Sequence, residues 1–492
     1  MRFLMAYHDL HDFIKKLRNR DLLKDIYEEV DSELEITEIT DRVVKSGGPA
    51  LLFHKVKNSK YPVLTNAFGS YERMNLALGV EDIGKLSDGI ANIIDIENYL
   101  GLINKVKAIP PLLQATTAFP IKLPGKGLCQ QVVEENCDLN SLPVLKCWPL
   151  DGGKFITLPI VITKDADSGI QNCGMYRLQV YDSCTTGMHW HLHKDGRELY
   201  DKHRKRGMRM PVAVALGCDP AITYAATAPL PPQIDEMLFA GYLRKAPVPL
   251  VKAITSDIYV PANAEFILEG YVDTLEPLKL EGPFGDHTGY YSKVDYYPVF
   301  HVTCITHRRD AIYPATVVGK PPMEDCFLGK ATERLFLPLL KLQFPEIIDI
   351  NFPLEGVFHN CIIVSIKKRF PGHARKVMYG LWGTGQMMYT KMIIVVDDKV
   401  NPHDLSTVAW KVFNNIDARR DFVFAEGPLD ALDHASAMGH YGSRVGIDAT
   451  IKLKEEGHPG DWPEDVDMTR EIKELVNRRW EEYGFNKSNK KD

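Results

Sequence analysis

The middle of the chain contains seven short segments with the residue pattern of β-strands, separated by turn-forming residues. Most of them are rich in β-branched and aromatic residues, and Gly, Pro, Asn or Asp residues lie between them. Many short strands with turn signals between them favour a β-barrel or a β-sandwich. The seven segments are residues 155–163, 174–181, 187–193, 211–217, 250–254, 264–272 and 297–307.

The residues before this β-rich part predict both helices and strands. Residues 11–26 have apolar residues at helical spacing, so we expect one amphipathic helix there, with Leu22 and Leu23 on its apolar side. A second helix should begin at Asp31 and end at Gly47, because glycine commonly follows the last turn of a helix. Strands are expected at residues 50–56 and 61–66.

Beyond residue 326 the pattern alternates between helices and strands, which is typical of an α/β unit. Strands are expected at residues 359–367, 392–397 and 421–425, and helices at 373–388, 401–415 and 468–483. The whole chain therefore predicts an α+β protein of four parts. These are an N-terminal α+β region (1–115), a β-rich domain (116–322), an α/β domain (323–465) and a C-terminal helix with a tail (466–492).

Charge and composition exclude several classes of protein. The net charge of −6 argues against nucleic-acid binding, and no apolar run approaches the roughly 18 residues of a membrane span. Charged residues interrupt the first 16 residues, which therefore lack the apolar core of a signal peptide. The nine cysteines include no C-x-x-C pair, which favours reduced thiols. We expect a cytoplasmic protein.

The stretch from Glu281 to Tyr291, Glu-Gly-Pro-Phe-Gly-Asp-His-Thr-Gly-Tyr-Tyr, places two acids on either side of a turn. Pro283 fixes its own φ angle, and the flanking glycines allow conformations that other residues resist. Such a turn can bring the carboxyl groups of Glu281 and Asp286 close together. Nearby like charges raise one pKa, so one acid can hold a proton while the other stays ionised. A solvated hairpin tip is the alternative.

Three further positions offer groups that bind anions or metals. Arg177 lies on the predicted strand 174–181, and its guanidinium can bind a carboxylate or phosphate through two hydrogen bonds, unless it faces solvent. Glu236 lies near the start of a predicted helix and supplies a hard oxygen ligand. Asn172, one histidine and Glu236 would together suit Mn²⁺ or Mg²⁺. Helix capping by Asn172 and a surface position for Glu236 are the alternatives.

The segment Met188-His-Trp-His-Leu-His193 has a histidine at every second position. If it is a strand, His189, His191 and His193 share one face and lie about 6.5 Å apart in succession. Two neighbouring imidazoles can then converge on one metal ion or one anion. A single histidine would more often be structural, whereas three on one face favour a functional site.

Four segments, taken together, resemble the UbiD family of prenylated-flavin-dependent decarboxylases over nearly the whole chain. They are Gln-Asn-Cys-Gly-Met-Tyr-Arg at 171–177, the strand at 212–220 that ends Ala-Leu-Gly-Cys-Asp-Pro, Glu-Gly-Pro-Phe-Gly-Asp at 281–286, and Gly-Ile-Asp-Ala-Thr at 446–450. The most similar branch is that of the 3-polyprenyl-4-hydroxybenzoate decarboxylases of quinone biosynthesis. Residues 34–39 and 47–53 also match that branch.

This resemblance implies a carboxy-lyase that uses prenylated FMN supplied by a partner flavin prenyltransferase. It also implies Mn²⁺, with K⁺ as a further ion, between the cofactor phosphate and the protein. The implied fold is a split β-barrel of the flavin reductase type, joined to an α/β C-terminal domain that forms a homo-oligomer of two to six subunits. A polyprenylated substrate would place the protein at the inner face of the membrane.

Site residues follow from the same resemblance, position by position. The metal ligands would be Asn172, His193 and Glu236, with His191 as the alternative to His193. The catalytic residues would be Arg177, Glu281 and Asp286, with Asp286 as the proton donor. The cofactor would contact Met175, Tyr176, Arg177, His189, Trp190, His191, Lys194 and Asp195.

The chain departs from ubiquinone-pathway relatives at His189-Trp-His191, where they have Arg-Trp-Leu. This departure changes the charge beside the cofactor. The substrate could therefore be a polyprenylated precursor of ubiquinone or menaquinone, or a small hydroxyaryl acid outside quinone biosynthesis.

Loss of CO₂ from an aromatic acid leaves negative charge that no side chain stabilises well, so an electron sink is needed, and the cofactor supplies it. We expect Arg177 to hold the substrate carboxylate and to orient Glu281, while Asp286 donates the proton. Two alternatives are a flavin oxidoreductase on the same fold and a non-catalytic scaffold. No G-x-G-x-x-G follows a strand, so dinucleotide binding has no support, and a scaffold has no use for these three residues.

Overall fold

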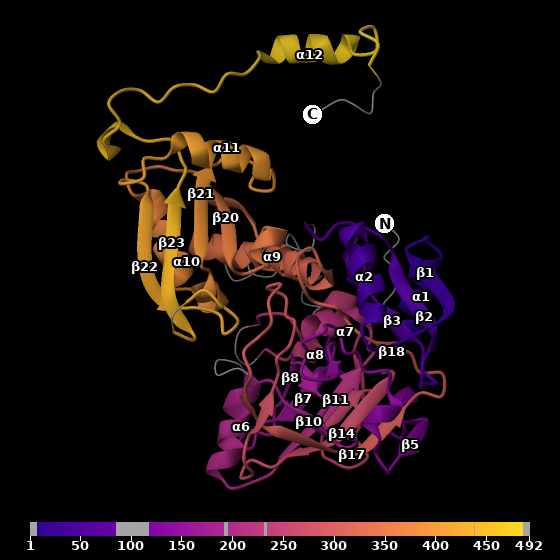
Figure 1. Cartoon of the computed structure of the whole chain (residues 1–492). Coiled ribbons are helices and arrows are strands. Elements are labelled where there is room, and N and C mark those ends of the chain that lie inside the picture. Colours follow the sequence, from indigo (N-terminus) through magenta and orange to yellow (C-terminus); the bar gives the residue numbers. More distant parts are fainter. Residues whose placement is uncertain (1–6, 85–117, 191–194, 231–233, 437, 486–492) are drawn as a thin grey trace, which may run out of the picture.

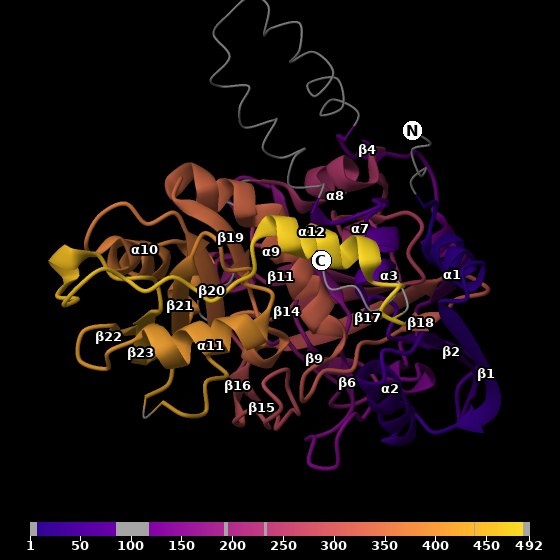
Figure 2. The same ribbon diagram turned by 90° about the horizontal axis from the view of Figure 1, so that it is seen from above.

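The computed structural model describes residues 7–84, 118–190, 195–230, 234–436 and 438–485. Figure 1 shows an N-terminal region beside a central β-rich region, and a C-terminal α/β region that the long helix α9 (Glu324–Gln343) joins to the rest. Seen at a right angle in Figure 2, the N-terminal and C-terminal regions lie at opposite ends of the molecule. The mixed α and β content that the sequence predicts is confirmed.

The N-terminal region is a four-stranded sheet covered by helices. Its strand order is β1-β2-β3-β18, with β1 parallel to β2. Since β18 comes from the far end of the central region, this sheet ties the two regions together. The elements are α1 (Leu10–Arg18), β1 (Leu23–Val30), α2 (Glu35–Lys45), β2 (Ala50–Val56), β3 (Val63–Thr65), α3 (Tyr71–Ala77) and β18 (Tyr313–Pro314).

The single helix predicted for residues 11–26 is wrong in its second half. Helix α1 ends at Arg18, Asp21 adopts a positive φ of 56°, and Leu23 begins strand β1. Pairing of β1 with β2 is a long-range contact, and it overrides the helical spacing of the apolar residues here. The predicted end of the next helix at Gly47 is confirmed, since Gly47 has a φ of +68° just after α2.

The central region is built on a seven-stranded antiparallel sheet in the order β10-β17-β14-β11-β7-β8, with β5 also paired to β17. Both faces of the sheet are buried: Val212 and Val214 of β11 face the core shared with the N-terminal sheet, and Ala213 and Ala215 face helices α7 and α8. In the described residues the end strands β10 and β8 are not paired with each other, so the sheet is open. The bounds are β5 (Val132–Glu134), β7 (Ile160–Lys164), β8 (Gln171–Met175), β10 (Thr185–Gly187), β11 (Met210–Leu216), α7 (Pro220–Ala225), α8 (Glu236–Arg244), β14 (Phe266–Val272) and β17 (Val299–His307).

Smaller elements complete this region, and two of them, β15 and β16, flank the turn that follows Glu281. They are β4 (Ile121–Lys122), β6 (Phe155–Ile156), β9 (Leu178–Gln179), α6 (Asp195–Lys205), β12 (Pro249–Lys252), β13 (Tyr259–Pro261), β15 (Lys279–Glu281) and β16 (Asp295–Tyr297).

The strand predicted for residues 187–193 is wrong over residues 188–190, because β10 already ends at Gly187. Gly187 pairs with Val299 of β17, and the next residue of the partner strand would be Pro298. The amide of Met188 still donates to the backbone oxygen of Pro298 at 2.9 Å, but proline has no N–H to return the bond, so the regular ladder ends there. His189 therefore lies in a segment outside the strand, and His191 and His193 lie outside the described residues.

The C-terminal region is a five-stranded sheet in the order β19-β20-β21-β23-β22. Its three middle strands are parallel, and its two edge strands run antiparallel to their neighbours. The predicted helix 373–388 ends early, at Trp382, and a 3₁₀ turn follows it. The elements are β19 (Ile347–Asn351), β20 (Cys361–Ile366), α10 (His373–Trp382), η5 (Gly385–Tyr389), β21 (Met392–Asp397), α11 (Leu405–Asn415), β22 (Phe422–Pro428) and β23 (Tyr441–Asp448).

Helix α12 (Arg470–Arg479) lies apart from the three regions, at the end of an extended segment (Figure 1). None of its residues is buried against the rest of the chain. No helix among the described residues is long and apolar enough to cross a bilayer.

The nine cysteines include one pair that the sequence did not predict. Cys137 and Cys184 form a disulfide with their Cα atoms 5.8 Å apart, although 47 positions separate them. The expectation of reduced thiols throughout is therefore wrong for this pair. The other seven cysteines are free.

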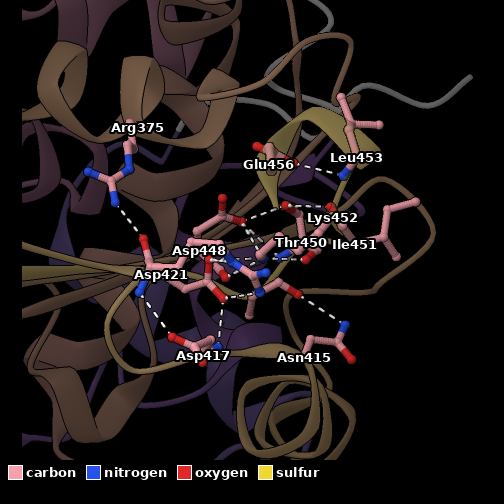
Figure 3. A network of polar contacts seen from close by, with 12 residues as sticks. Arg375, Asn415, Asp417, Asp421, Asp448, Thr450, Ile451, Lys452, Leu453 and Glu456 are labelled. Atoms are coloured by element: carbon pink, nitrogen blue, oxygen red, sulfur yellow. Dashed lines mark hydrogen bonds and ion pairs between the residues drawn. The ribbon is translucent and has the colours of Figure 1, made fainter. Parts of the chain in front are cut away.

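A cluster of buried charges follows the end of β23 in the C-terminal region (Figure 3). The Nζ atom of Lys452 donates to the backbone oxygens of Asp448 and Thr450, at 2.8 and 2.6 Å, and to the carboxylate of Asp448 at 3.2 Å. The carboxylate of Asp421 lies 3.7 Å from the same nitrogen. This cluster, called the Lys452 cluster below, joins the beginning of β22 to the segment after β23.

Candidate active site

A cavity of about 1040 Å³ lies between the central sheet and the C-terminal region. Strand β8, the turn after β15 and helix α9 form one wall, and residues of the C-terminal region form the other. A cavity of this size is at the upper end of the range for small-molecule and cofactor sites, and such sites are common between domains. The lining residues from the C-terminal region include Phe358, His359, Met387, Tyr389, Leu429, Asp430 and His440.

Arg177 is the centre of the charged wall of this cavity. It lies between β8 and β9, and its Nε donates to Glu281 Oε1 at 3.0 Å. Its Nη1 forms an ion pair with Asp286, and its Nη2 donates to the hydroxyl oxygen of Ser292 at 3.2 Å. The guanidinium also lies 4.7 Å from the centre of the Phe284 ring. The structure therefore brings together the three residues that the sequence predicts to act together.

The turn between β15 and β16 holds both acids in place. Gly282 has a φ of +96°, which side chains disfavour, and a Cβ at Gly285 would approach Trp148 to 2.2 Å. The amide of Gly285 donates to the carboxylate of Asp151 at 2.7 Å. Both glycines are thus required by the local geometry, and the buried Asp151 anchors the turn from outside.

His189 contacts the carboxylate of Glu281, which also accepts from Arg177. Its Nδ1 lies 2.9 and 3.1 Å from the two carboxylate oxygens of Glu281, and its ring lies 4.3 Å from that of Tyr297. Glu281 is fully buried, so its two contacts with cationic or polar partners compensate for its desolvation. His189 therefore orients Glu281 toward Arg177.

Both acids have lowered pKa values. Burial by itself would raise the pKa of Glu281 and of Asp286, but the positive charge of Arg177 outweighs it, helped by His189 at Glu281 and by His287 at Asp286. The expectation that like charge raises one of the two pKa values is therefore wrong. The reason is that a buried guanidinium contacts both carboxylates, which no turn pattern in the sequence reveals.

Asp286 also begins a chain of contacts that the sequence did not predict. His287 Nδ1 lies 2.8 Å from Asp286 Oδ1, and His287 Nε2 lies 2.8 Å from Nε2 of His359. The His287 ring stacks on Phe358, with 5.0 Å between ring centres. His359 and Phe358 belong to the C-terminal region, 72 positions away in the sequence, and no local motif marks them.

Two of the three predicted metal ligands lie side by side in the cavity wall. Asn172 Nδ2 donates to Glu236 Oε1 at 3.2 Å, and the amide of Cys173 donates to Glu236 Oε2 at 3.1 Å. Burial raises the pKa of Glu236 to about 7. The side-chain oxygen of Asn172 is buried and accepts no hydrogen bond from the described residues. Two buried oxygen donors, one without a partner, fit a hard divalent cation.

The remaining predicted residues differ in position. Met175, Tyr176 and Asp195 line the cavity, as does His189. Trp190 is buried in the hydrophobic core beside Tyr200, away from the described cavity lining. His191, His193 and Lys194 lie outside the described residues. Among the described residues, no group of three or more His, Cys, Asp or Glu side chains is arranged to hold a metal ion.

Sequence comparison identifies three regions of the chain. Residues 14–90 match the 3-octaprenyl-4-hydroxybenzoate carboxy-lyase N-terminal domain, and residues 122–321 match its Rift-related domain. Residues 326–449 match its C-terminal domain. A protein of Archaeoglobus fulgidus that carries the description "Uncharacterized protein" is 50% identical over 480 residues, which cover 97% of this chain and 99% of that protein.

Solved structures are similar along the whole chain. The vanillic acid decarboxylase of Sedimentibacter hydroxybenzoicus in its closed form has a TM-score of 0.84 and 27% identity, covering 98% of this chain and 100% of the other. The UbiD-class enzyme HmfF of Pelotomaculum thermopropionicum, in complex with FMN, has a TM-score of 0.79 and 28% identity, with coverage of 94% and 97%. An evolved dimeric form of HmfF is known in complex with prFMN.

The cavity, the arginine that contacts both acids and the three matched regions together define a carboxy-lyase. The chain belongs to the UbiD family.

Proposed function

We propose that this protein removes the carboxyl group of an aromatic acid as CO₂, with prenylated FMN bound in the 1040 Å³ cavity. The observation that carries the proposal is the contact of one buried arginine, Arg177, with both Glu281 and Asp286 in the cavity wall. HmfF, which binds FMN and prFMN, and the vanillic acid decarboxylase support the cofactor and the class of substrate.

The cofactor would supply the electron sink that side chains lack when the carbon–carbon bond to CO₂ breaks. Residues that line the cavity next to β8 would hold it: Met175, Tyr176, Arg177, His189 and Asp195, with His191 and Lys194 as predicted from the sequence. The central sheet, which is open in the described residues, would be the split β-barrel that the family resemblance implies. Because both faces of the central sheet are buried, the sheet gives the site a rigid support.

Arg177 would bind the substrate carboxylate and Asp286 would deliver the proton. In the free protein, the ion pair with Arg177 keeps Asp286 ionised. When a substrate carboxylate binds Arg177, the guanidinium interacts less with Asp286, and its lowering of the pKa of Asp286 is lost. Burial then favours the protonated form of Asp286. Asp286 thereby becomes an acid only when substrate is present. Glu281, held by His189, keeps the guanidinium oriented.

A divalent cation, Mn²⁺ with K⁺ as a further ion, would be held by Asn172 and Glu236, together with His193 from outside the described residues. The buried side-chain oxygen of Asn172 supports this assignment. The ion's charge would compensate for the buried carboxylate of Glu236 and attract a phosphate group.

The substrate in its finer detail remains a proposal: a polyprenylated 4-hydroxybenzoate of ubiquinone or menaquinone biosynthesis, or a smaller hydroxyaryl acid. We place the protein in the cytoplasm, and a polyprenylated substrate would bring it to the inner membrane face. A homo-oligomer of two to six subunits is also proposed, each subunit being divided into the four parts 1–115, 116–322, 323–465 and 466–492. Helix α12, which buries no residue in its own chain, would dock on a neighbouring subunit. Truncation at Asp465 should then lower the mass of the assembly, and an unchanged mass would contradict this role.

The decisive experiment is co-expression with a flavin prenyltransferase, followed by an assay of CO₂ release from a panel of aryl acids. We expect CO₂ release that depends on the prenyltransferase. Nicotinamide oxidation without CO₂ release would favour a flavin oxidoreductase instead, and partner binding without any turnover would favour a scaffold.

A further inference from the structure

Asp286 needs a source of protons, if the proposed function holds. Each loss of CO₂ from an aryl carboxylate leaves one proton from the protein on the ring, so the donor must be recharged in every turnover. Asp286 is only 6% exposed. One of its oxygens pairs with Arg177, which does not give up a proton in proteins, and the other contacts His287. His287 is therefore the group through which a proton can return.

The contacts continue without a gap from His287 into the C-terminal region. Its Nδ1 faces Asp286 at 2.8 Å and its Nε2 faces His359 Nε2 at 2.8 Å. Two imidazole nitrogens at this distance share one proton, since one must donate and the other accept. The Nδ1 atom of His359 is buried and has no hydrogen-bond partner among the described residues, and the ring lines the cavity. Because this nitrogen is closed to solvent here, it can exchange a proton with water only when the cavity opens beside the ring.

We propose that His287 and His359 form a proton relay that recharges Asp286 after each turnover. Asp286 gives its proton to the ring carbon as the bond to CO₂ breaks, and becomes a carboxylate. His287 then passes the proton on Nδ1 to Asp286, and His359 passes the proton on Nε2 to His287. Water protonates His359 at Nδ1, so one proton is taken up for each CO₂ released. Both rings are then in the opposite tautomer, and each returns to its starting form by losing one N–H proton to water and gaining one at its other nitrogen when the cavity opens for product release. His359 acts through His287 and is a positioning residue.

The charges around the two rings favour this direction of transfer. Burial opposes a positive charge on both rings, but contact with Asp286 raises the pKa of His287. Burial lowers the pKa of His359 to about 4, although Asp430 and Asp286 act in the opposite sense. Asp325 also faces His287, and burial raises the pKa of Asp325 to about 7. Transfer of a proton from His359 to His287 is therefore favoured, toward the acid that needs it.

The relay is complete only when the C-terminal region rests on the turn that contains Asp286. Phe358 and His359 reach His287 from that region, and the ring of His434 lies 3.9 Å from the ring of Tyr290 in the same turn. Contact between the two regions would thus couple closure of the cavity to the proton supply.

The test uses the holoenzyme, an aryl acid that the wild type decarboxylates, and the variant His359→Gln. Glutamine can still hydrogen bond to His287 but cannot pass a proton on. We expect the first turnover, measured by rapid quench, to keep its wild-type rate. Later turnovers should slow by about tenfold or more, in line with the usual contribution of a proton-transfer group, with KM unchanged. Added imidazole should restore part of the rate.

His403→Gln is the matched control, because His403 lies in the same region and its ring, within the described residues, hydrogen bonds to the part-exposed Asp349 and to no residue of the cavity. It should behave as the wild type in both phases. If His359→Gln slowed the first and later turnovers equally, or neither, the relay would be refuted and the decarboxylase would stand. Wild-type protein that releases no CO₂ from any aryl acid would instead overturn the proposed function, and the relay with it.

A second measurement does not depend on turnover or on the stability of a variant. In wild-type protein labelled with ¹⁵N-histidine, NMR should show one strongly deshielded proton shared by two imidazole Nε2 atoms, and coupled titration of the two rings. Two histidines that titrate independently would contradict the relay.

Discussion

The Arg177 group in the cavity wall and the Lys452 cluster after β23 have the same ingredients: one buried cation and two carboxylates. They differ in what else contacts the cation. Lys452 is saturated by backbone oxygens of its own loop and by Asp448, and none of its partners lines the described cavity. Arg177 is held by side chains alone, and both Arg177 and its partner Asp286 line the cavity.

The difference separates a structural charge cluster from a chemical one. Backbone partners cannot leave without unfolding the loop, so the Lys452 cluster can only hold β22 and β23 together (Figure 3). Side-chain partners can be exchanged for a substrate carboxylate when the cavity opens beside them. Burial and charge therefore do not identify an active site, whereas replaceable partners next to a cavity do.

The largest effect should come from replacing the proton donor. Asp286→Asn should lower kcat for CO₂ release by about 10³-fold, because the amide cannot donate the proton while its shape and its contact with Arg177 are kept. Cofactor absorbance should be unchanged. Full activity in this variant would show that Asp286 has no chemical role. The Arg177 group would then be a structural charge cluster like the Lys452 cluster.

Lys452→Met should have the opposite effect: the protein should lose stability but keep its catalytic rate. Removal of the cation takes away the buried partner that Asp448 and Asp421 share, although Lys368 and Arg420 stay near them, so the free energy of unfolding of the C-terminal region should fall by about 3 kcal/mol. Urea denaturation measures this loss. The rate per folded molecule should stay that of the wild type, and a specific loss of kcat would contradict a purely structural role.

Acid should weaken the Arg177 group in a predictable direction. The pKa values of Glu281 and Asp286 are lowered by folding, so their stabilising contribution is complete above the usual values of 4.5 and 3.8 and is lost as the pH falls through the lower values of the folded state. The difference in unfolding free energy between wild type and Asp286→Asn should therefore decrease below about pH 4. Each unit by which folding lowers the pKa corresponds to about 1.4 kcal/mol. A difference independent of pH would show that Asp286 is not ionised in the folded protein.

The smallest effect should come from an exposed ion pair next to the Lys452 cluster. Lys454 pairs with Asp461 at 2.8 Å, and both side chains are largely exposed. Lys454→Met should change the free energy of unfolding by less than about 0.5 kcal/mol, since solvent screens such pairs. A loss comparable to that of Lys452→Met would mean that burial is not what separates the two lysines.

The predicted elements show where sequence patterns succeed. Three strands of the C-terminal region, β20, β21 and β22, and the glycine after α2 were predicted because their patterns depend on neighbours in the chain, whereas β19 and β23 were not predicted. The helix predicted for residues 11–26 is wrong where β1 pairs with β2. The strand predicted for residues 187–193 ends at Gly187, because Pro298, just before β17, has no N–H to donate. Both errors arose from partners distant in the sequence, which a local pattern does not contain.

For the site, the residue types and motifs of this sequence determined that Arg177, Glu281 and Asp286 belong together and that the chain resembles the UbiD family. Only the tertiary structure decided that both acids are ionised around one guanidinium, and that His359 reaches His287 from the C-terminal region. The physical reason is the same in both cases. Motifs report which groups are present, whereas charge states and proton routes depend on burial and on contacts of a few ångströms between segments far apart in the chain.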